Sequence, residues 1–257
     1  MFCLFQLIKN KIFLILLAAV LAVPLAGASF AAEWNLDGST TDNGNIRKIV
    51  EIFKQGDVVH LFDGNGRKIL RTFPDGKSGK KVEYRMSYDS SGRLMQVECF
   101  IDGKKVSVEK GTYDDDGLLR SIICYDAGGR ELFTTTMLIY DEESRLLKMY
   151  GMQTPNGIID YYYRRGKDGR IVYVRCMMKN KMVSSAYYKY YDNGMIEEVR
   201  RFNEKMHNAG ILRNSWKLDK KGNWIEKKSF LYSNLAQRAV FAEIVSRKIE
   251  YSKQESL

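Results

Sequence analysis

Runs of aromatic and β-branched residues of strand length recur along the chain. Three such runs occupy residues 161–163, 171–174 and 187–191, and this composition favours strands over helices. Polar segments containing Asp and Gly separate the runs, as expected for hairpin connections. The pattern predicts an all-β protein.

The runs repeat with a period of 25 to 28 residues, and such self-similarity indicates a repeat architecture. The most regular position is a glycine, replaced once by Ser144, and it occurs at Gly66, Gly92, Gly117, Gly169, Gly194 and Gly222. Most units read aromatic-Asp-x-x-Gly-x-apolar. Asp at the first position of a type I turn accepts backbone hydrogen bonds, and Gly three places later takes the left-handed conformation that closes a hairpin.

A second turn falls midway through each unit, at Asp75-Gly76, Asp102-Gly103, Gly128-Gly129, Pro155-Asn156-Gly157, Asn180, Glu204 and Asn234. Connections this short join antiparallel neighbours. We therefore predict an antiparallel β-meander of about seven two-strand repeats, roughly 14 strands in all. They should form a single curved or superhelical sheet. The sequence leaves open whether this sheet closes into a barrel.

The segment 236–251 has a composition that suits a helix or a strand. Because the final edge of a meander needs a covering element, we predict a closing strand from Ile244 to Tyr251.

The first 31 residues have the pattern of a secretory signal peptide. Lys9 and Lys11 precede an uncharged stretch that runs to Ala32, and Ser29-Phe30-Ala31 fits a small-x-small cleavage site. We expect a signal peptide at 1–31, a polar lead-in at 32–45 and one β-repeat domain at 46–257. The protein should be exported, to the periplasm or beyond, and contact a membrane only through this segment. The alternative is an uncleaved N-terminal anchor.

The repeat unit resembles the YD repeat of bacterial Rhs-type proteins, whose core reads Tyr-x-Tyr-Asp-x-x-Gly-Arg-Leu. The segment 88–94, Tyr-Asp-Ser-Ser-Gly-Arg-Leu, matches that core, and 140–146 matches it with Ser in place of Gly. The segment 190–194 is similar to MORN-variant repeats of small bacterial β-repeat proteins, which include antitoxins. The segment 219–224 is similar to the terminal unit of short secreted YD-repeat proteins. The resemblance implies the architecture and carries over no functional residue.

Residues that carry catalytic or metal chemistry are few. His60 and His207 are the only histidines, and neither has metal-binding spacing. We interpret His60 as a core position of a strand and His207 as a turn residue. The acidic clusters 114–116 and 63–66 fall on repeat turns and lack the Glu of a calcium loop. We expect no metal, no cofactor and no enzymatic activity.

Three cysteines remain after the signal peptide: Cys99, Cys124 and Cys176. Each follows a reference glycine by seven residues, so all three should point to one face of the sheet. Equivalent positions of successive two-strand repeats are about 9.6 Å apart, whereas a disulfide needs Cβ atoms about 3.5–4.5 Å apart. We predict three unpaired thiols.

The basic residues suggest a binding surface. The chain carries a net charge of +10, which becomes +8 without Lys9 and Lys11. One interpretation is a solvated sheet face with charged edges. The other is a basic and aromatic face that holds an anionic polymer, with candidate ligand-binding residues Tyr161, Tyr163, Arg164, Arg165, Lys167, Arg170, Lys220 and Lys221.

These features favour a noncatalytic extracytoplasmic binding or scaffold protein that contacts a cell-envelope component or a protein partner. Nucleic acid is not expected as a partner of an exported protein. Two alternatives stay open. One is an envelope carbohydrate-active enzyme on a β-rich scaffold, because carboxylates paired across a sheet are invisible in a sequence. The other is an immunity-like or antitoxin-like protein, which the MORN-variant likeness implies.

Overall fold

Each strand of the protein pairs with the strands that precede and follow it in the chain. The computed structural model describes residues 45–252 except 77, 141, 143–145, 155–156 and 233–238. The predicted signal peptide, nearly all of the lead-in, and the predicted turns at 155–156 and Asn234 lie outside the described residues. The described part of the chain contains sixteen antiparallel strands and no helix.

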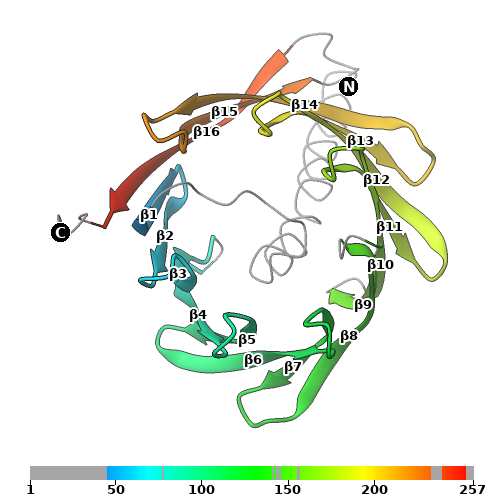
Figure 1. The fold of residues 1–257 in the computed structure, drawn as a ribbon. Coiled ribbons are helices and arrows are strands. Elements are labelled where there is room, and N and C mark those ends of the chain that lie inside the picture. The colour runs from blue at the N-terminus through cyan, green and yellow to red at the C-terminus, as the bar shows by residue number, and fades with distance from the viewer. Residues whose placement is uncertain are drawn as a thin grey trace, which may run out of the picture.

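The first eight strands are β1 (Ile46–Phe53), β2 (Gly56–Phe62), β3 (Lys68–Pro74), β4 (Lys81–Tyr88), β5 (Leu94–Ile101), β6 (Lys104–Tyr113), β7 (Leu119–Asp126) and β8 (Glu131–Tyr140). The other eight are β9 (Leu146–Thr154), β10 (Gly157–Arg165), β11 (Ile171–Met178), β12 (Lys181–Tyr190), β13 (Ile196–Asn203), β14 (Asn208–Leu218), β15 (Trp224–Tyr232) and β16 (Ala239–Tyr251). Figure 1 shows them in chain order around a ring. The prediction of an all-β meander is confirmed.

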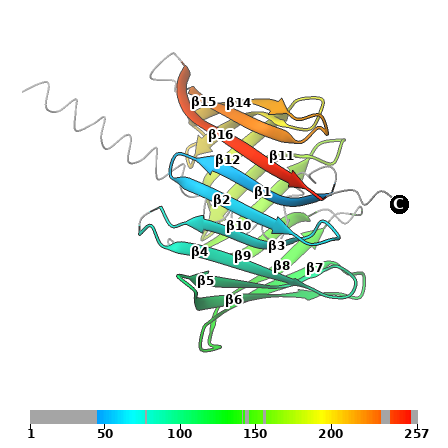
Figure 2. The same cartoon turned by 90° about the vertical axis from the view of Figure 1, so that its left-hand side faces the viewer.

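The ring is closed, which the sequence did not decide. β1 pairs with β2 on one side and with β16 on the other, where Ile49 lies opposite Ile249. Figure 2 shows β16 lying alongside β1. Fourteen strands, β2 to β15, flank the seven turns of the repeat, and β1 and β16 complete the barrel. The predicted closing strand is present and begins at Ala239, five residues before the predicted start.

The six repeat turns that the structure describes have the predicted geometry, and the seventh, at Ser144, lies outside the described residues. In the turn after β4, the Gly92 N–H donates to the Asp89 carbonyl and the Asp89 N–H donates to the Arg93 carbonyl. Gly92 has a φ of 82°, a conformation that favours glycine. The same backbone bonds form where Gly166 or Tyr191 replaces Asp. The backbone turn is therefore more constant than the motif.

In the four repeats whose motif begins with Tyr, this residue joins the repeat to the one before it. Tyr113 donates its hydroxyl hydrogen to the Leu94 carbonyl at the start of β5, and Arg93 lies over the Tyr113 ring. The strand register shifts at Tyr88, Tyr113, Tyr140 and Tyr190, as at a β-bulge. The same hydroxyl bond is made by Tyr88, Tyr140 and Tyr190.

The two faces of the barrel differ in burial. The largest fully buried side chains, Ile49, Ile122, Thr135, Ile159 and Val245, share one face when followed through the strand register. Side chains converge on the concave inside of a barrel and diverge on its convex outside. We therefore assign this buried face as the inner face and the opposite one as the outer face.

Other predictions that depend on the strand register also hold. His60 is buried on the inner face of β2, and His207 lies in the turn after β13. Cys99, Cys124 and Cys176 are free thiols, and the register places all three on the inner face. No apolar helix long enough to cross a membrane occurs among the described residues.

Candidate binding face

The eight candidate ligand-binding residues do not form one site. Tyr161 and Tyr163 point to the inner face of β10, whereas Arg164, which follows Tyr163, points outward. The remaining five lie in or beside two repeat turns, Arg165, Lys167 and Arg170 between β10 and β11, and Lys220 and Lys221 between β14 and β15. The side chains alternate along a strand, so neighbours in the sequence separate onto opposite faces.

Several turn residues of this set hold the turns together. Arg165 donates to the Gly169 carbonyl, and Arg170 lies 3.4 Å from Asp168 and 5.6 Å from the centre of the Tyr190 ring. Lys221 lies 3.7 Å from the centre of the Tyr251 ring. Lys167 and Lys220 are exposed. The basic residues of the turns thus act largely within the repeat.

Tyr161 and Tyr163 belong to the core. Their rings are stacked with centres 6.4 Å apart, and they pack against the cluster around Met86, Val97 and Ile122. Burial raises the pKa of the Tyr161 hydroxyl well above its usual range. These tyrosines support the barrel wall from inside.

Around Arg164 the structure assembles a set of outward side chains that the sequence did not indicate. We call it the outer strip, and it consists of Lys148, Tyr162, Arg164, Tyr173, Arg175 and Tyr187 on strands β9 to β12. Because side chains alternate along a strand, the sequence alone could have assigned Tyr162 to the same face as Arg164. The others are found only through cross-strand register, because bulges shift the alternation between strands.

The first row of the outer strip is centred on Tyr162. Lys148 on β9 and Arg175 on β11 are its direct cross-strand neighbours. Their charged groups lie 5.6 Å and 4.9 Å from the centre of the Tyr162 ring. A cation at this distance is attracted to the negative face of the ring, so Tyr162 holds two cations on the outer face.

The second row contains Arg164, Tyr173 and Tyr187. Arg164 pairs with Tyr173 across β10 and β11, and Tyr173 pairs with Tyr187 across β11 and β12. The ring centres of the two tyrosines are 4.5 Å apart. The Arg164 guanidinium lies 5.5 Å from the Tyr173 ring centre and 6.0 Å from that of Tyr187. Tyr187 also packs edge-on against Phe202 of β13.

The cations of the outer strip have no acidic partner. Among the described residues, Lys148, Arg164 and Arg175 contact aromatic rings and form no ion pair. Asp160 lies on the same face of β10, one alternation from Tyr162. Basic residues on the outer face of β4 and β6 are paired instead, with Arg85 on Glu83 and Lys105 on Glu98. On this part of the outer face, three cations therefore lie near a single carboxylate, that of Asp160.

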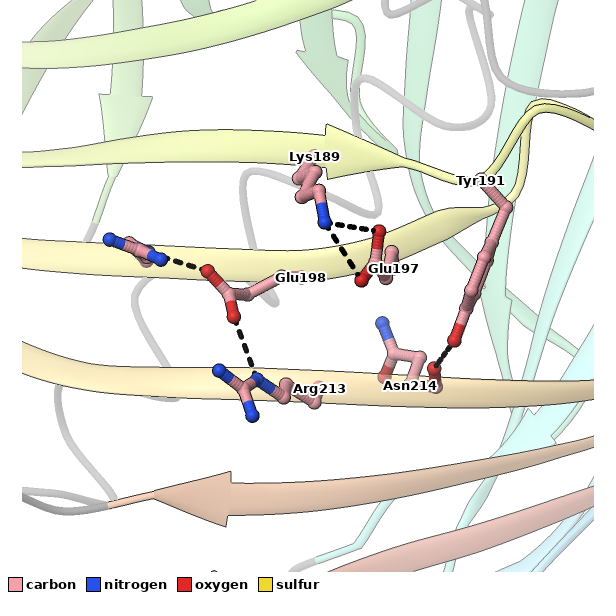
Figure 3. A network of polar contacts seen from close by, with 7 residues as sticks. Lys189, Tyr191, Glu197, Glu198, Arg213 and Asn214 are labelled. Carbon is pink, nitrogen blue, oxygen red and sulfur yellow. Dashed lines mark hydrogen bonds and ion pairs between the residues drawn. The ribbon is translucent and has the colours of Figure 1, made fainter.

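Next to the strip, Glu198 of β13 forms a compact ion network (Figure 3). Arg200 donates to one carboxylate oxygen at 2.5 Å and Arg213 of β14 to the other at 2.7 Å. Burial alone would raise the pKa of Glu198, but these hydrogen bonds and charges outweigh burial and lower the pKa. Lys189 binds the neighbouring Glu197. One side chain carboxylate thus neutralises part of the charge of two arginines.

The inner face carries another ion pair, at the closure between β1 and β16. Arg247 donates two hydrogen bonds to one oxygen of Glu51, at 2.9 Å and 2.7 Å, and His60 lies 3.6 Å from the other oxygen. Burial alone would raise the pKa of Glu51, but His60 and Arg247 lower it to about 2. Arg247 also lies over the Trp224 ring. This cluster joins the first and last strands.

No group of His, Cys, Asp and Glu among the described residues has the geometry of a metal site. Cys124 is buried beside Cys99, and burial raises the pKa of the Cys124 thiol to about 11. Such a thiol is protonated at neutral pH and a poor nucleophile. On the inner face, the cluster of Glu51, His60 and Arg247 serves strand closure.

No protein-family model and no curated protein matches the sequence. Among solved structures, the fold is similar to a porin-like protein from Bacteroides uniformis, with 13% identity and a TM-score of 0.53, over 81% of this chain and 98% of that one. A porin-like protein from Bacteroides vulgatus matches with 12% identity and a TM-score of 0.37, over 82% and 100% of the two chains.

A further match is to TcdB2–TccC3 without its hypervariable C-terminal region, with 11% identity and a TM-score of 0.34. It covers 73% of this chain and 13% of that one. Only the match to the Bacteroides uniformis protein has a TM-score high enough to indicate a shared β fold, and at 13% identity it gives no activity or partner.

Proposed function

We propose that this chain is a noncatalytic, exported binding protein that uses the outer strip to contact a component of the cell envelope. The observation that carries the proposal is the set of three cations, Lys148, Arg164 and Arg175, which lie over tyrosine rings and form no ion pair within the described part of the chain. Holding charged groups in place before binding reduces the entropy lost on association. The closed barrel supplies the rigid support.

The carboxylates that meet basic residues across strands favour binding over catalysis. Glu51 and Glu198 are each held by arginine, and their pKa values are lowered. A general acid in glycoside hydrolysis needs a raised pKa so that it is protonated near neutral pH. These two groups stay ionised, and each serves an ion pair between neighbouring strands.

The outer face is suited to water. Lys81, Arg85, Lys189, Arg200 and Arg213 lie within strands and project from it together with the outer strip. Charged side chains on a lipid-facing barrel surface cost about 2–4 kcal/mol each near the bilayer midplane. The charged side chains of the outer face therefore favour contact with water.

The proposal is tested by sedimenting the purified protein with isolated bacterial cell envelopes. The double variant Arg164→Ala/Arg175→Ala should lose most of the envelope-bound fraction. Arg85→Ala is the matched control, since it removes an outer-face arginine that lies 4.2 Å from the Phe100 ring centre on β4 and β5. Equal binding by the double variant and the native protein would contradict the proposal.

A further inference from the structure

We infer that the ligand of the outer strip is an acidic polysaccharide, a polymer that offers carboxylates and hydroxyls at regular spacing. This inference rests on the proposed function and names the chemistry of its ligand. It is argued from the spacing of the outer strip, from its unpaired hydrogen-bonding groups and from the way in which cations cover its rings.

The outer strip is elongated across the strands. Its first row runs from Lys148 through Tyr162 to Arg175 and continues, past the buried Ser185 of β12, to Phe202 of β13. Five neighbouring strands at about 4.8 Å span roughly 19 Å. The second row, from Arg164 through Tyr173 and Tyr187 to Arg200, crosses four strands, roughly 14 Å, beside the first. Two parallel rows of these lengths fit an extended chain better than a compact small molecule.

The groups that project from these rows are hydrogen-bond donors and phenol hydroxyls. Among the described residues, the hydroxyls of Tyr173 and Tyr187 make no hydrogen bond, and Arg164 and Arg175 have no carboxylate. A guanidinium binds a carboxylate through two parallel hydrogen bonds. A phenol hydroxyl both donates to and accepts from an alcohol. The two kinds of group together match a polymer that alternates carboxylates with hydroxyls.

The covering of the rings distinguishes this ligand from a single-stranded nucleic acid. Nucleic-acid bases bind by stacking on open aromatic faces. Here the Tyr162 ring has cations from both neighbouring strands over it, and Arg164 lies over Tyr173 and Tyr187. Tyr187 and Phe202 are nearly perpendicular, at 80°. The faces of these rings are occupied by cations. The groups that remain for a ligand to contact are therefore polar.

The test measures binding of the full chain to four immobilised polymers over a series of salt concentrations. Polygalacturonate supplies carboxylates and hydroxyls, polyphosphate supplies charge alone, dextran supplies hydroxyls alone, and oligothymidylate supplies bases and phosphates. We expect the tightest binding to polygalacturonate. Tighter binding to polyphosphate, dextran or oligothymidylate would overturn the acidic-polysaccharide assignment.

Two kinds of variant distinguish the contribution of the arginine charges to binding from the contribution of the tyrosine hydroxyls. Arg164→Ala and Arg175→Ala should each weaken polygalacturonate binding about tenfold or more and reduce its salt dependence. Tyr173→Phe and Tyr187→Phe keep the rings, and should each weaken binding about two- to tenfold at unchanged salt dependence. Arg85→Ala should bind as the native protein does. Tyrosine variants that bind like the native protein would leave only a charge interaction and overturn the inference.

The experiments can contradict the ligand class and the proposed function independently of each other. If the arginine variants lose envelope binding while polygalacturonate does not bind, the ligand class is wrong and the binding face stands. If the arginine variants keep envelope binding, the proposed function itself fails, whatever the polymers do.

Discussion

The motif Tyr, present in four of the seven repeats, has a role that its position in the motif explains. It follows a β-bulge, and its hydroxyl bonds a carbonyl at the start of a strand in the preceding repeat. Burial raises the pKa of Tyr113 and Tyr140 to about 12, so these hydroxyls stay protonated and can donate. The motif tyrosine is therefore a joint between repeats.

Replacing Tyr113 by Phe should destabilise the protein by about 1 kcal/mol, because it deletes the hydrogen bond to Leu94 and leaves the ring in place. Thermal unfolding would measure this change as a drop of about 2–4 °C. Tyr125→Phe is the control, since among the described residues the Tyr125 hydroxyl makes no hydrogen bond while its ring contacts Lys110. Equal effects of both substitutions would mean that the hydroxyl bond does not matter.

The three cysteines should be unreactive in the folded protein and available in the unfolded one. Burial raises the pKa of Cys99, Cys124 and Cys176, and the thiolate is the reactive form. Iodoacetamide at pH 8 should label the native protein slowly. In denaturant without reductant it should label all three thiols, as counted by mass spectrometry. A peptide joining Cys99 to Cys124 would contradict the strand register.

At the scale of the elements, the repeat turns are organised by their aspartates. Asp89 accepts from the Arg93 backbone N–H and from the Arg93 guanidinium. These contacts lower the pKa of Asp89, with the backbone hydrogen bond as the largest cause. The pKa of Asp114 is lowered in the same way, first by the Leu118 N–H. The turn thus binds the ionised form of Asp more strongly than the protonated form.

This preference predicts acid sensitivity. A carboxylate whose pKa is lower in the folded state contributes stability above its unfolded pKa, here about 3.8, and loses it as pH falls through the folded value. The melting temperature should therefore fall steeply below about pH 4. The variant Asp89→Asn should melt lower at pH 7 and lose less on acidification. An identical slope for both proteins would show that Asp89 does not contribute.

At the scale of the whole molecule, the barrel depends on the pairing of strands that are farthest apart in the chain. The β1–β16 contact differs from the repeat joints, because it uses the buried Glu51–Arg247 pair and the exposed Lys48–Glu250 pair. The Tyr251 hydroxyl binds Asp219, so the last strand also takes part in the final repeat turn. The contact between β1 and β16 is thus formed by residues specific to the first and last strands.

Arg247→Met should destabilise the barrel by about 3–5 kcal/mol, because it leaves the buried Glu51 carboxylate without its main partner. Chemical denaturation would measure the change. The double variant Glu51→Leu/Arg247→Met should recover much of the loss. Lys48→Ala breaks the exposed pair across the same strands and should cost about 1 kcal/mol or less. Equal costs for the two single variants would refute the special role of Glu51 in closure.

The same pair gives the closure its own pH range. Since the pKa of Glu51 is lowered from 4.5 to about 2, the stability that it contributes is present above about pH 4.5 and disappears as pH falls toward 2. The acid-induced fall in melting temperature should be smaller in the Glu51→Leu/Arg247→Met variant than in the native protein. An equal fall in both would place the acid sensitivity elsewhere.

The sequence by itself determined the local structure of this protein. Turn chemistry acts over four or five residues, so the Asp and Gly of the motif specify hairpins wherever they occur. Strand propensity and the short connections then require an antiparallel meander, and the strand near the C-terminus follows from the need to cover an edge. The sequence also determined that Cys99, Cys124 and Cys176 occupy the same position of their repeats, because the repeat period is 25 to 28 residues.

Only the tertiary structure decided closure and the composition of the outer strip. Closure depends on the accumulated twist and stagger of sixteen strands, and no local segment contains that sum. Alternation along β10 places Tyr161 and Tyr163 in the core and Tyr162 and Arg164 on the outer face, and the cross-strand register places Tyr173 and Tyr187 beside Arg164. The partner of a side chain in a sheet lies on the next strand, tens of residues away in the sequence, and only the strand register brings the two together.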